Sequence, residues 1–179
     1  MNYHNITKDD MSNGNGLRVV LWVAGCEHHC KGCQNPVTWD PNDGIPFDDD
    51  AKKEIFDQLD KDYIKGITFS GGDPLATYNY PAVAELCREI RKKYPNKDIW
   101  IYTGYAYDLL KDTTIVKEEL ADVIVDGEYV EELRDVNLHW IGSSNQKIIN
   151  VHTGEEYIKQ ERSVISKDYK SGEQCGCND

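Results

Sequence analysis

Three cysteines near the start of the chain have the residue type and spacing best suited to chemistry. Cys26, Cys30 and Cys33 form a C-x3-C-x2-C pattern, and the next cysteine along the chain is Cys87. Thiolates this close together bind zinc or an iron–sulfur cluster, and the metal in either case has four ligand positions. The pattern therefore predicts a metal site whose last position is filled by another residue or left open for chemistry.

Structural zinc is one interpretation of these cysteines. His28 or His29 would then supply the fourth ligand. Structural zinc sites usually pair two cysteine knuckles, and the absence of a second knuckle here counts against this interpretation. Cys175 and Cys177 lie in a polar tail at an abnormal spacing; they are a redox or metal-binding pair or two exposed thiols, and we favour exposed thiols. The other interpretation is a 4Fe-4S cluster in which three thiolates hold three irons and the fourth iron stays open. The ligand count favours the cluster, and loop histidines are mostly solvated.

The bulk composition excludes several classes of protein. A chain of 179 residues is long enough for one domain with a sizeable core. Its 32 acidic and 20 basic residues give a formal net charge of −12, which excludes general nucleic-acid binding. The sequence has neither a secretory signal nor an apolar run long enough to span a membrane. We therefore expect a cytoplasmic protein without a membrane partner, whose clustered cysteines serve metal or redox chemistry rather than disulfides.

Strands alternate with helices along the chain. Apolar, β-branched runs predict strands at 17–23, 66–70, 98–102, 123–125 and 147–151. Apolar residues at helical spacing, with aspartates at the first helix start, predict helices at 48–60 and 81–93, the second with Cys87 in the core. The alternation predicts an α/β fold with a mainly parallel sheet.

Loops of unusual sequence follow four of the predicted strands. They are the cysteine cluster, Gly71-Gly72-Asp73, Thr103-Gly104-Tyr105 and Asp126-Gly127. In parallel sheets, ligands bind at the carboxyl ends of the strands. The four loops therefore predict one site at that edge of the sheet.

The composition changes after Val151. The remaining sequence is polar and charged with little periodicity. We expect a folded domain over 1–151 and a poorly ordered or loosely docked extension over 152–179.

Together these motifs resemble a known family. The cysteine pattern is similar to the signature of the radical S-adenosylmethionine (SAM) enzymes. The stretch from Asn13 to Trp39 more narrowly resembles the activating proteins of anaerobic ribonucleoside-triphosphate reductases, and the resemblance extends over about 1–151. Matching pieces farther along are 70–75, 98–100, 102–105, 125–127 and 142–146. Ile141 stands where this family usually has Arg, so a bidentate contact of a guanidinium is missing there.

The resemblance implies an incomplete radical SAM-type (βα) barrel and two cofactors, a 4Fe-4S cluster and SAM. Cys26, Cys30 and Cys33 would ligate the cluster, and SAM would chelate its open iron, the position that a fourth thiolate would occupy. Glycines would let the backbone approach the methionyl group, and Asp73 would place a negative charge near its amino group. No catalytic side chain beyond the cluster and SAM is needed. The implied cofactor-binding residues are Gly32, Cys33, Gln34, Gly71, Gly72, Asp73 and Thr103.

The implied activity is that of an oxidoreductase, a radical SAM activase. It would abstract hydrogen from a backbone glycine in the large subunit of the anaerobic ribonucleoside-triphosphate reductase and leave a glycyl radical there. An outside electron donor such as a flavodoxin is also implied. The alternatives are an activase of another glycyl-radical enzyme, a small radical SAM enzyme acting on a free metabolite, and a non-catalytic zinc-binding module.

Overall fold

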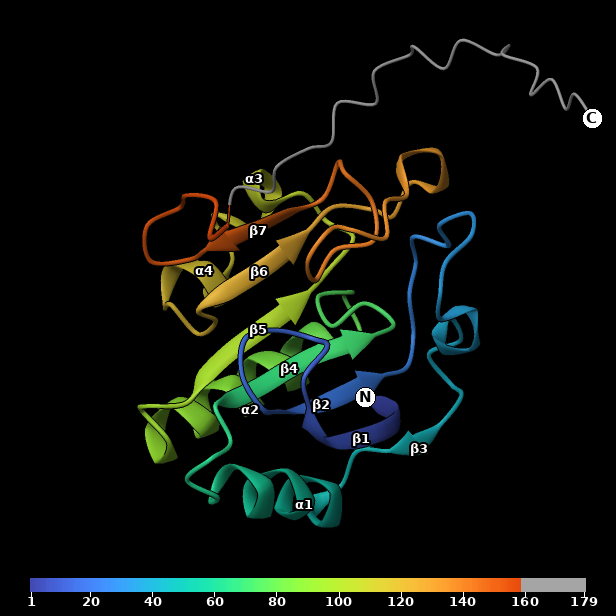
Figure 1. Cartoon of the computed structure of the whole chain (residues 1–179). Coiled ribbons are helices and arrows are strands. Elements are labelled where there is room, and N and C mark those ends of the chain that lie inside the picture. The colour runs from blue at the N-terminus through green and yellow to red at the C-terminus, as the bar shows by residue number, and fades with distance from the viewer. Residues whose placement is uncertain (159–179) are drawn as a thin grey trace, which may run out of the picture.

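The structure is a computed structural model that describes residues 1–158. One sheet runs through the molecule, with helices beside it (Figure 1). The strands are β1 (Asn2–Asp10), β2 (Arg18–Val23), β3 (Ile45–Pro46), β4 (Gly66–Gly71), β5 (Asp98–Tyr102), β6 (Val123–Asp126) and β7 (Lys147–Asn150). The helices are η1 (Pro36–Thr38), α1 (Asp49–Leu59), α2 (Tyr80–Lys93), α3 (Tyr107–Leu110), α4 (Thr114–Lys117) and η2 (Glu131–Leu133), of which η1 and η2 are 3-10 helices.

The middle of the sheet is parallel and its margins are antiparallel. The strand order is β3-β1-β2-β4-β5-β6-β7, and β2, β4, β5 and β6 run parallel. β1 pairs antiparallel with β2 and β3, and β7 pairs antiparallel with β6. This confirms the α/β class with a parallel centre. The predicted barrel is not confirmed, because the sheet is open and ends at β3 on one side and at β7 on the other.

The sequence patterns missed β1, a strand of nine residues. Only two of its apolar side chains are buried, Tyr3 and Ile6, and the rest of the strand is polar. Its neighbour β2 supplies the partner backbone, and the Trp22 indole donates a hydrogen bond of 2.7 Å to Thr7 Oγ1. A strand whose pairing comes from a buried neighbour does not need an apolar run of its own.

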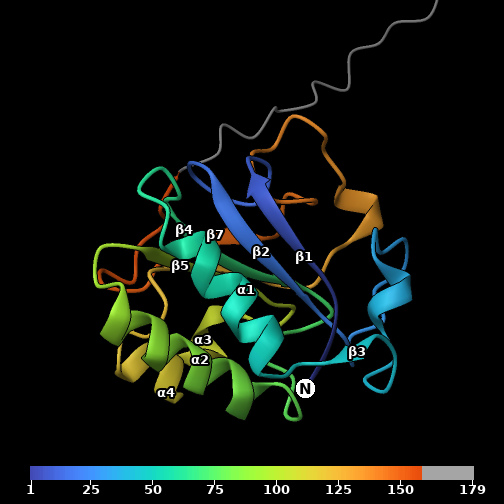
Figure 2. The same cartoon turned by 90° about the horizontal axis from the view of Figure 1, so that it is seen from below.

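The two long helices begin and end close to the predicted positions. Asp48 caps α1, since its carboxylate accepts a hydrogen bond of 3.0 Å from Ala51 N. Cys87 is fully buried on the apolar face of α2, as predicted. The α-helices lie on one face of the sheet (Figure 2), where the larger core forms.

A smaller cluster of Trp100, Val123, Val125 and Ile148 covers part of the opposite face. At the amino ends of the parallel strands, the fully buried Arg18 lies 5.1 Å from the centre of the Trp100 ring. Its guanidinium forms an ion pair of 2.6 Å with Asp98, and it donates further hydrogen bonds to carbonyls at this edge. This edge is closed by packing and charge.

The end of the described chain returns to the sheet. Tyr157 N donates a hydrogen bond of 2.7 Å to Ile148 O, and the Tyr157 ring meets the edge of Trp100. Most of the predicted extension, including Cys175 and Cys177, lies outside the described residues, so the domain boundary at 151 stays a prediction. Within residues 1–158, no helix has the length and apolar character needed to cross a membrane.

Candidate metal centre

The loop with the three cysteines leaves the carboxyl end of β2 and closes back on its own start. Gly25 N donates to Thr38 O at 2.7 Å, and Cys26 N donates to Trp39 O at 3.0 Å. Both acceptors lie at the end of η1, so this short helix clamps the two ends of the loop together. The arrowheads of β2, β4, β5 and β6 end at the same edge of the sheet as this loop (Figure 1).

One cleft of about 140 Å3 lies between this loop and the ends of β4, β5 and β6. Its lining brings together the four loops that the sequence singled out. The residues assigned to cofactors from the sequence line this cleft, except Gly32; they are Cys26, Cys30, Cys33, Gln34, Gly71, Gly72, Asp73 and Thr103. Gly32 lies outside, against the Glu131 carboxylate.

The three thiols have the donor set of a cluster site. Each is only partly exposed, and burial raises the pKa of Cys26 and Cys30 above the usual range. Backbone amides act in the opposite direction, from His28 on Cys26 and from Tyr129 on Cys30. Cys33 Sγ accepts a hydrogen bond of 3.3 Å from Asn35 N. Amides aimed at sulfur stabilise thiolate ligands and tune iron–sulfur clusters.

The three thiols do not converge on one point within residues 1–158. Among residues 1–158, no three His, Cys, Asp or Glu side chains lie close enough to share one metal ion. A structural zinc ion needs such convergence, because all of its ligands bind one atom. A 4Fe-4S cluster places each thiolate on a different iron, so its ligands stand farther apart.

The glycine pair after β4 allows a close approach of two backbones. A Cβ on Gly71 would lie 2.8 Å from Val23 O, and one on Gly72 would lie 2.2 Å from Gly25 O. Gly72 N also donates to Val23 O at 2.8 Å. The pair makes room for the end of β2 and the start of the cysteine loop, and its contact with a cofactor stays a prediction.

Asp73 is 1% exposed and joins the loops around the cleft. Its carboxylate accepts hydrogen bonds from Leu75 N at 2.7 Å, from Thr103 Oγ1 at 3.0 Å and from Gly104 N at 3.0 Å. His28 Nε2 is a further partner at 2.7 Å. The predicted charge near the cleft is present, and protein groups already surround it.

His28 is not the solvated loop histidine that the sequence led us to expect. Its side chain is 10% exposed, and its two ring nitrogens face Asp73 and Glu128, at 2.7 and 3.0 Å. Ionised carboxylates only accept hydrogen bonds, so both ring nitrogens carry protons. The bond to Asp73 is the main cause that raises the pKa of His28 to about 9. His29, in contrast, is exposed and lies against Trp39.

Two amide side chains that the sequence patterns missed also hold the cleft together. Asn79 is 1% exposed and donates to Ala24 O at 2.8 Å and to Asp73 O at 3.0 Å. Gln146 donates to Gly127 O at 2.9 Å and accepts from Gly142 N at 2.9 Å. No local sequence pattern identifies amide side chains that will bind distant backbone groups. For Gln146, the one signal was its place in the stretch 142–146 that matches the family.

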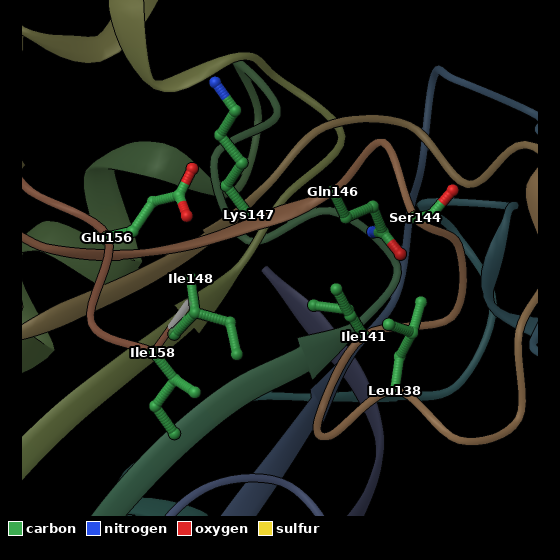
Figure 3. A pocket seen from close by; sticks show the side chains of 8 residues that line it. All are labelled: Leu138, Ile141, Ser144, Gln146, Lys147, Ile148, Glu156 and Ile158. Carbon is green, nitrogen blue, oxygen red and sulfur yellow. The ribbon is translucent and has the colours of Figure 1, made fainter. Parts of the chain in front are cut away.

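Ile141, which replaces the family's usual Arg, does not line the cleft with the cysteines. It lines a small pocket of about 20 Å3 with Leu138, Ile148 and Ile158 (Figure 3). It also packs against the cluster around Trp100. An apolar side chain suits this position in this chain.

Comparison with known proteins gives a consistent result. Residues 12–149 match the family described as a 4Fe-4S single cluster domain. The chain is 44% identical to the anaerobic ribonucleoside-triphosphate reductase-activating protein of Escherichia coli (strain K12) over 150 residues, 83% of this chain and 97% of that protein. Identically named proteins of Enterobacteria phage T4 and Vibrio cholerae are 42% and 40% identical, over 83% of this chain and 93% and 97% of their own.

Proposed function

The chain belongs to the family of anaerobic ribonucleoside-triphosphate reductase-activating proteins, and on that premise we propose that it is a SAM-dependent activase that generates a glycyl radical on such a reductase. The observation that supports this most directly is the cleft where three thiols and the Gly-Gly-Asp loop meet. This cleft lies at the carboxyl ends of parallel strands, where α/β proteins bind their ligands.

We propose Cys26, Cys30 and Cys33 as the ligands of a 4Fe-4S cluster. These residues would hold the cluster, which when bound would supply the one-electron chemistry that cleaves SAM to methionine and the radical needed to take a hydrogen atom from a glycine of the reductase. The chain holds the three thiols on one loop, and the fourth cysteine among residues 1–158, Cys87, is buried in the core and does not line the cleft. The backbone at Gly72, Asp73 and Thr103 would orient SAM beside it.

Three further parts complete the proposal. The open sheet would correspond to a reduced radical SAM barrel, with the cysteine loop after its first parallel strand. The direct partner would be the reductase large subunit. Electrons would come from a one-electron protein donor such as a flavodoxin.

The test is the behaviour of protein reconstituted anaerobically with iron and sulfide. We expect a reduced 4Fe-4S electron paramagnetic resonance signal that changes when SAM is added, together with release of 5′-deoxyadenosine. Adding the reductase should then give a glycyl radical signal. SAM cleavage without that signal would indicate another glycyl-radical enzyme or a free metabolite as substrate. Bound zinc without SAM cleavage would return the cysteines to a structural role.

The cysteine assignment has its own matched comparison. Replacing Cys26, Cys30 or Cys33 by Ala should abolish SAM cleavage, because each removal leaves one iron without its protein ligand. Cys87→Ala should retain cleavage, since this thiol lies on α2 and is buried in the core. Substantial 5′-deoxyadenosine from the Cys30→Ala variant would contradict the ligand set.

A further inference from the structure

We infer that His28 is a positioning residue that locks the cysteine loop onto the SAM-binding edge of the cleft. The inference rests on the proposed function and concerns what fixes the position of SAM relative to the cluster. The side chain stands between the first two cysteines in sequence and projects across the cleft to loops that follow three other strands.

Hydrogen bonds connect His28 to two of those loops. Nε2 lies 2.7 Å from Asp73 Oδ2, after β4, and Nδ1 lies 3.0 Å from Glu128 Oε1, after β6. These partners are 45 and 100 residues away along the chain. Both ring nitrogens are engaged by carboxylates, so neither is available as a metal ligand.

His28 contacts the third loop, after β5, by packing rather than by hydrogen bonds. The ring meets the edge of Tyr105, with 4.6 Å between ring centres. A Cβ on Gly104 would lie 2.5 Å from the imidazole, closer than real Cβ contacts allow. Glycine at 104 therefore lets the imidazole lie flat against the backbone.

The consequence is mechanical. Asp73 holds His28 with one oxygen and also binds Thr103 and Gly104, so the loops after β4 and β5 and the cysteine loop share one anchor. Without the imidazole, the cysteine loop is still clamped at its ends by η1. The cluster ligands should therefore remain together, while their distance and angle to SAM become loosely defined.

The experiment compares His28→Ala with His29→Asn, using iron content and the dissociation constant of SAM. His29 is the control because it is exposed in the same loop, and Asn tolerates its left-handed φ of 48°. We expect both variants to take up iron like the wild type. SAM binding should weaken about 10- to 100-fold in His28→Ala, the range found when residues that orient a site's ligands are lost, and stay unchanged in His29→Asn.

A spectroscopic readout and a conservative variant separate positioning from general destabilisation. The SAM-induced change in the reduced cluster signal should be diminished in His28→Ala. His28→Gln, which keeps an amide donor toward Asp73, should recover part of the lost SAM affinity. Unchanged SAM binding in His28→Ala, or loss of its iron, would overturn the inference, because the first leaves His28 without a role and the second assigns it to cluster assembly.

The Gly104→Ala variant tests the inference even if His28→Ala does not fold, and a double-mutant cycle adds to the test if it does. Gly104→Ala keeps the histidine but displaces its ring, so it should retain iron and weaken SAM binding. In a foldable His28→Ala background the same substitution should add little, because the ring it displaces is gone. Unchanged SAM binding in Gly104→Ala would overturn the inference. A wild-type protein that binds neither cluster nor SAM would instead refute the proposed function.

Discussion

Each end of the parallel strands contains a charged side chain that is almost fully buried, and comparing the two separates scaffold from site. Arg18 at the amino edge is completely buried, and Asp73 at the carboxyl edge is 1% exposed. Arg18 is held by backbone carbonyls, Thr68 and Asp98, all of which belong to the strands or the loop before them. Asp73 is held by the amides and side chains of loops around a cleft.

The difference predicts different consequences of losing each charge. The partners of Arg18 lie largely inside the fold, with Thr68 fully buried and the Asp98 side chain 22% exposed, so its removal leaves polar groups there without a partner. The partners of Asp73 face an open cleft, where water can replace part of what is lost. Damage at the amino edge should therefore appear as lost stability, and damage at the carboxyl edge as lost cofactor binding.

Arg18→Ala should have the largest effect on stability. It leaves the Asp98 carboxylate, whose pKa is already raised mainly by burial, without its counter-ion. We expect the free energy of unfolding to fall by about 3–5 kcal/mol, the cost of breaking a buried ion pair from one side. Urea unfolding of the cluster-free chain measures this. Adding Asp98→Asn to Arg18→Ala should restore part of the lost stability, because the unpaired carboxylate is removed. If Arg18→Ala lowers the free energy of unfolding by less than about 1 kcal/mol, the value typical of surface pairs, the two edges do not differ as the comparison requires.

Asp73→Ala should cost less stability and more function. The free energy of unfolding should fall by about 1–3 kcal/mol, the cost of leaving hydrogen-bond donors without their acceptor. The loss is smaller than for Arg18→Ala because His28 retains Glu128 as a partner. SAM binding should be lost, since the loops after β4 and β5 no longer share an anchor. Urea unfolding and SAM titration on the same preparations check both. A loss of stability as large as that of Arg18→Ala, with SAM binding intact, would reverse the comparison.

Asn79→Ala tests the junction between scaffold and site. Its amide satisfies the carbonyls of Ala24 and Asp73, so its removal should cost about 1–2 kcal/mol through unpaired buried acceptors. Thermal unfolding measures the loss, with Asn42→Ala as an exposed control expected to stay within about 0.5 kcal/mol. An effect no larger than the control's would show that water replaces the amide there.

The smallest effect concerns pH and lies at the amino edge, where Asp122 directly precedes β6 and His152 follows β7. His152 forms hydrogen bonds with Asp122 and Glu119. These bonds raise the pKa of His152 in the folded state, the one to Asp122 most. A raised histidine pKa stabilises the fold below the unfolded value of about 6.5 and ceases to do so as pH rises through the folded value. We expect His152→Gln to cost at most about 1 kcal/mol at pH 5–6, because the pair is exposed. The difference from wild type should shrink with rising pH; a growing difference would contradict the assignment.

Local patterns predicted the regular core well. Continuous apolar runs mark strands buried on both faces, which is why β2, β4, β5 and β6 were predicted close to their observed bounds. Helical spacing did the same for α1 and α2. The strand β1 escaped because its partner, rather than its composition, makes it a strand. The short α3 and α4, of four residues each, carry too few residues for a periodic signal.

For the site, the sequence by itself determined the chemistry: three thiols at loop spacing, glycines after a strand and the family to which their combination belongs. Only the tertiary structure decided how these parts are held. The partners of His28, Asp73 and Asn79 are brought together by strand order, across separations of up to 100 residues. Hydrogen bonds between loops depend on where the strands end in space, and no local pattern of residue types records that.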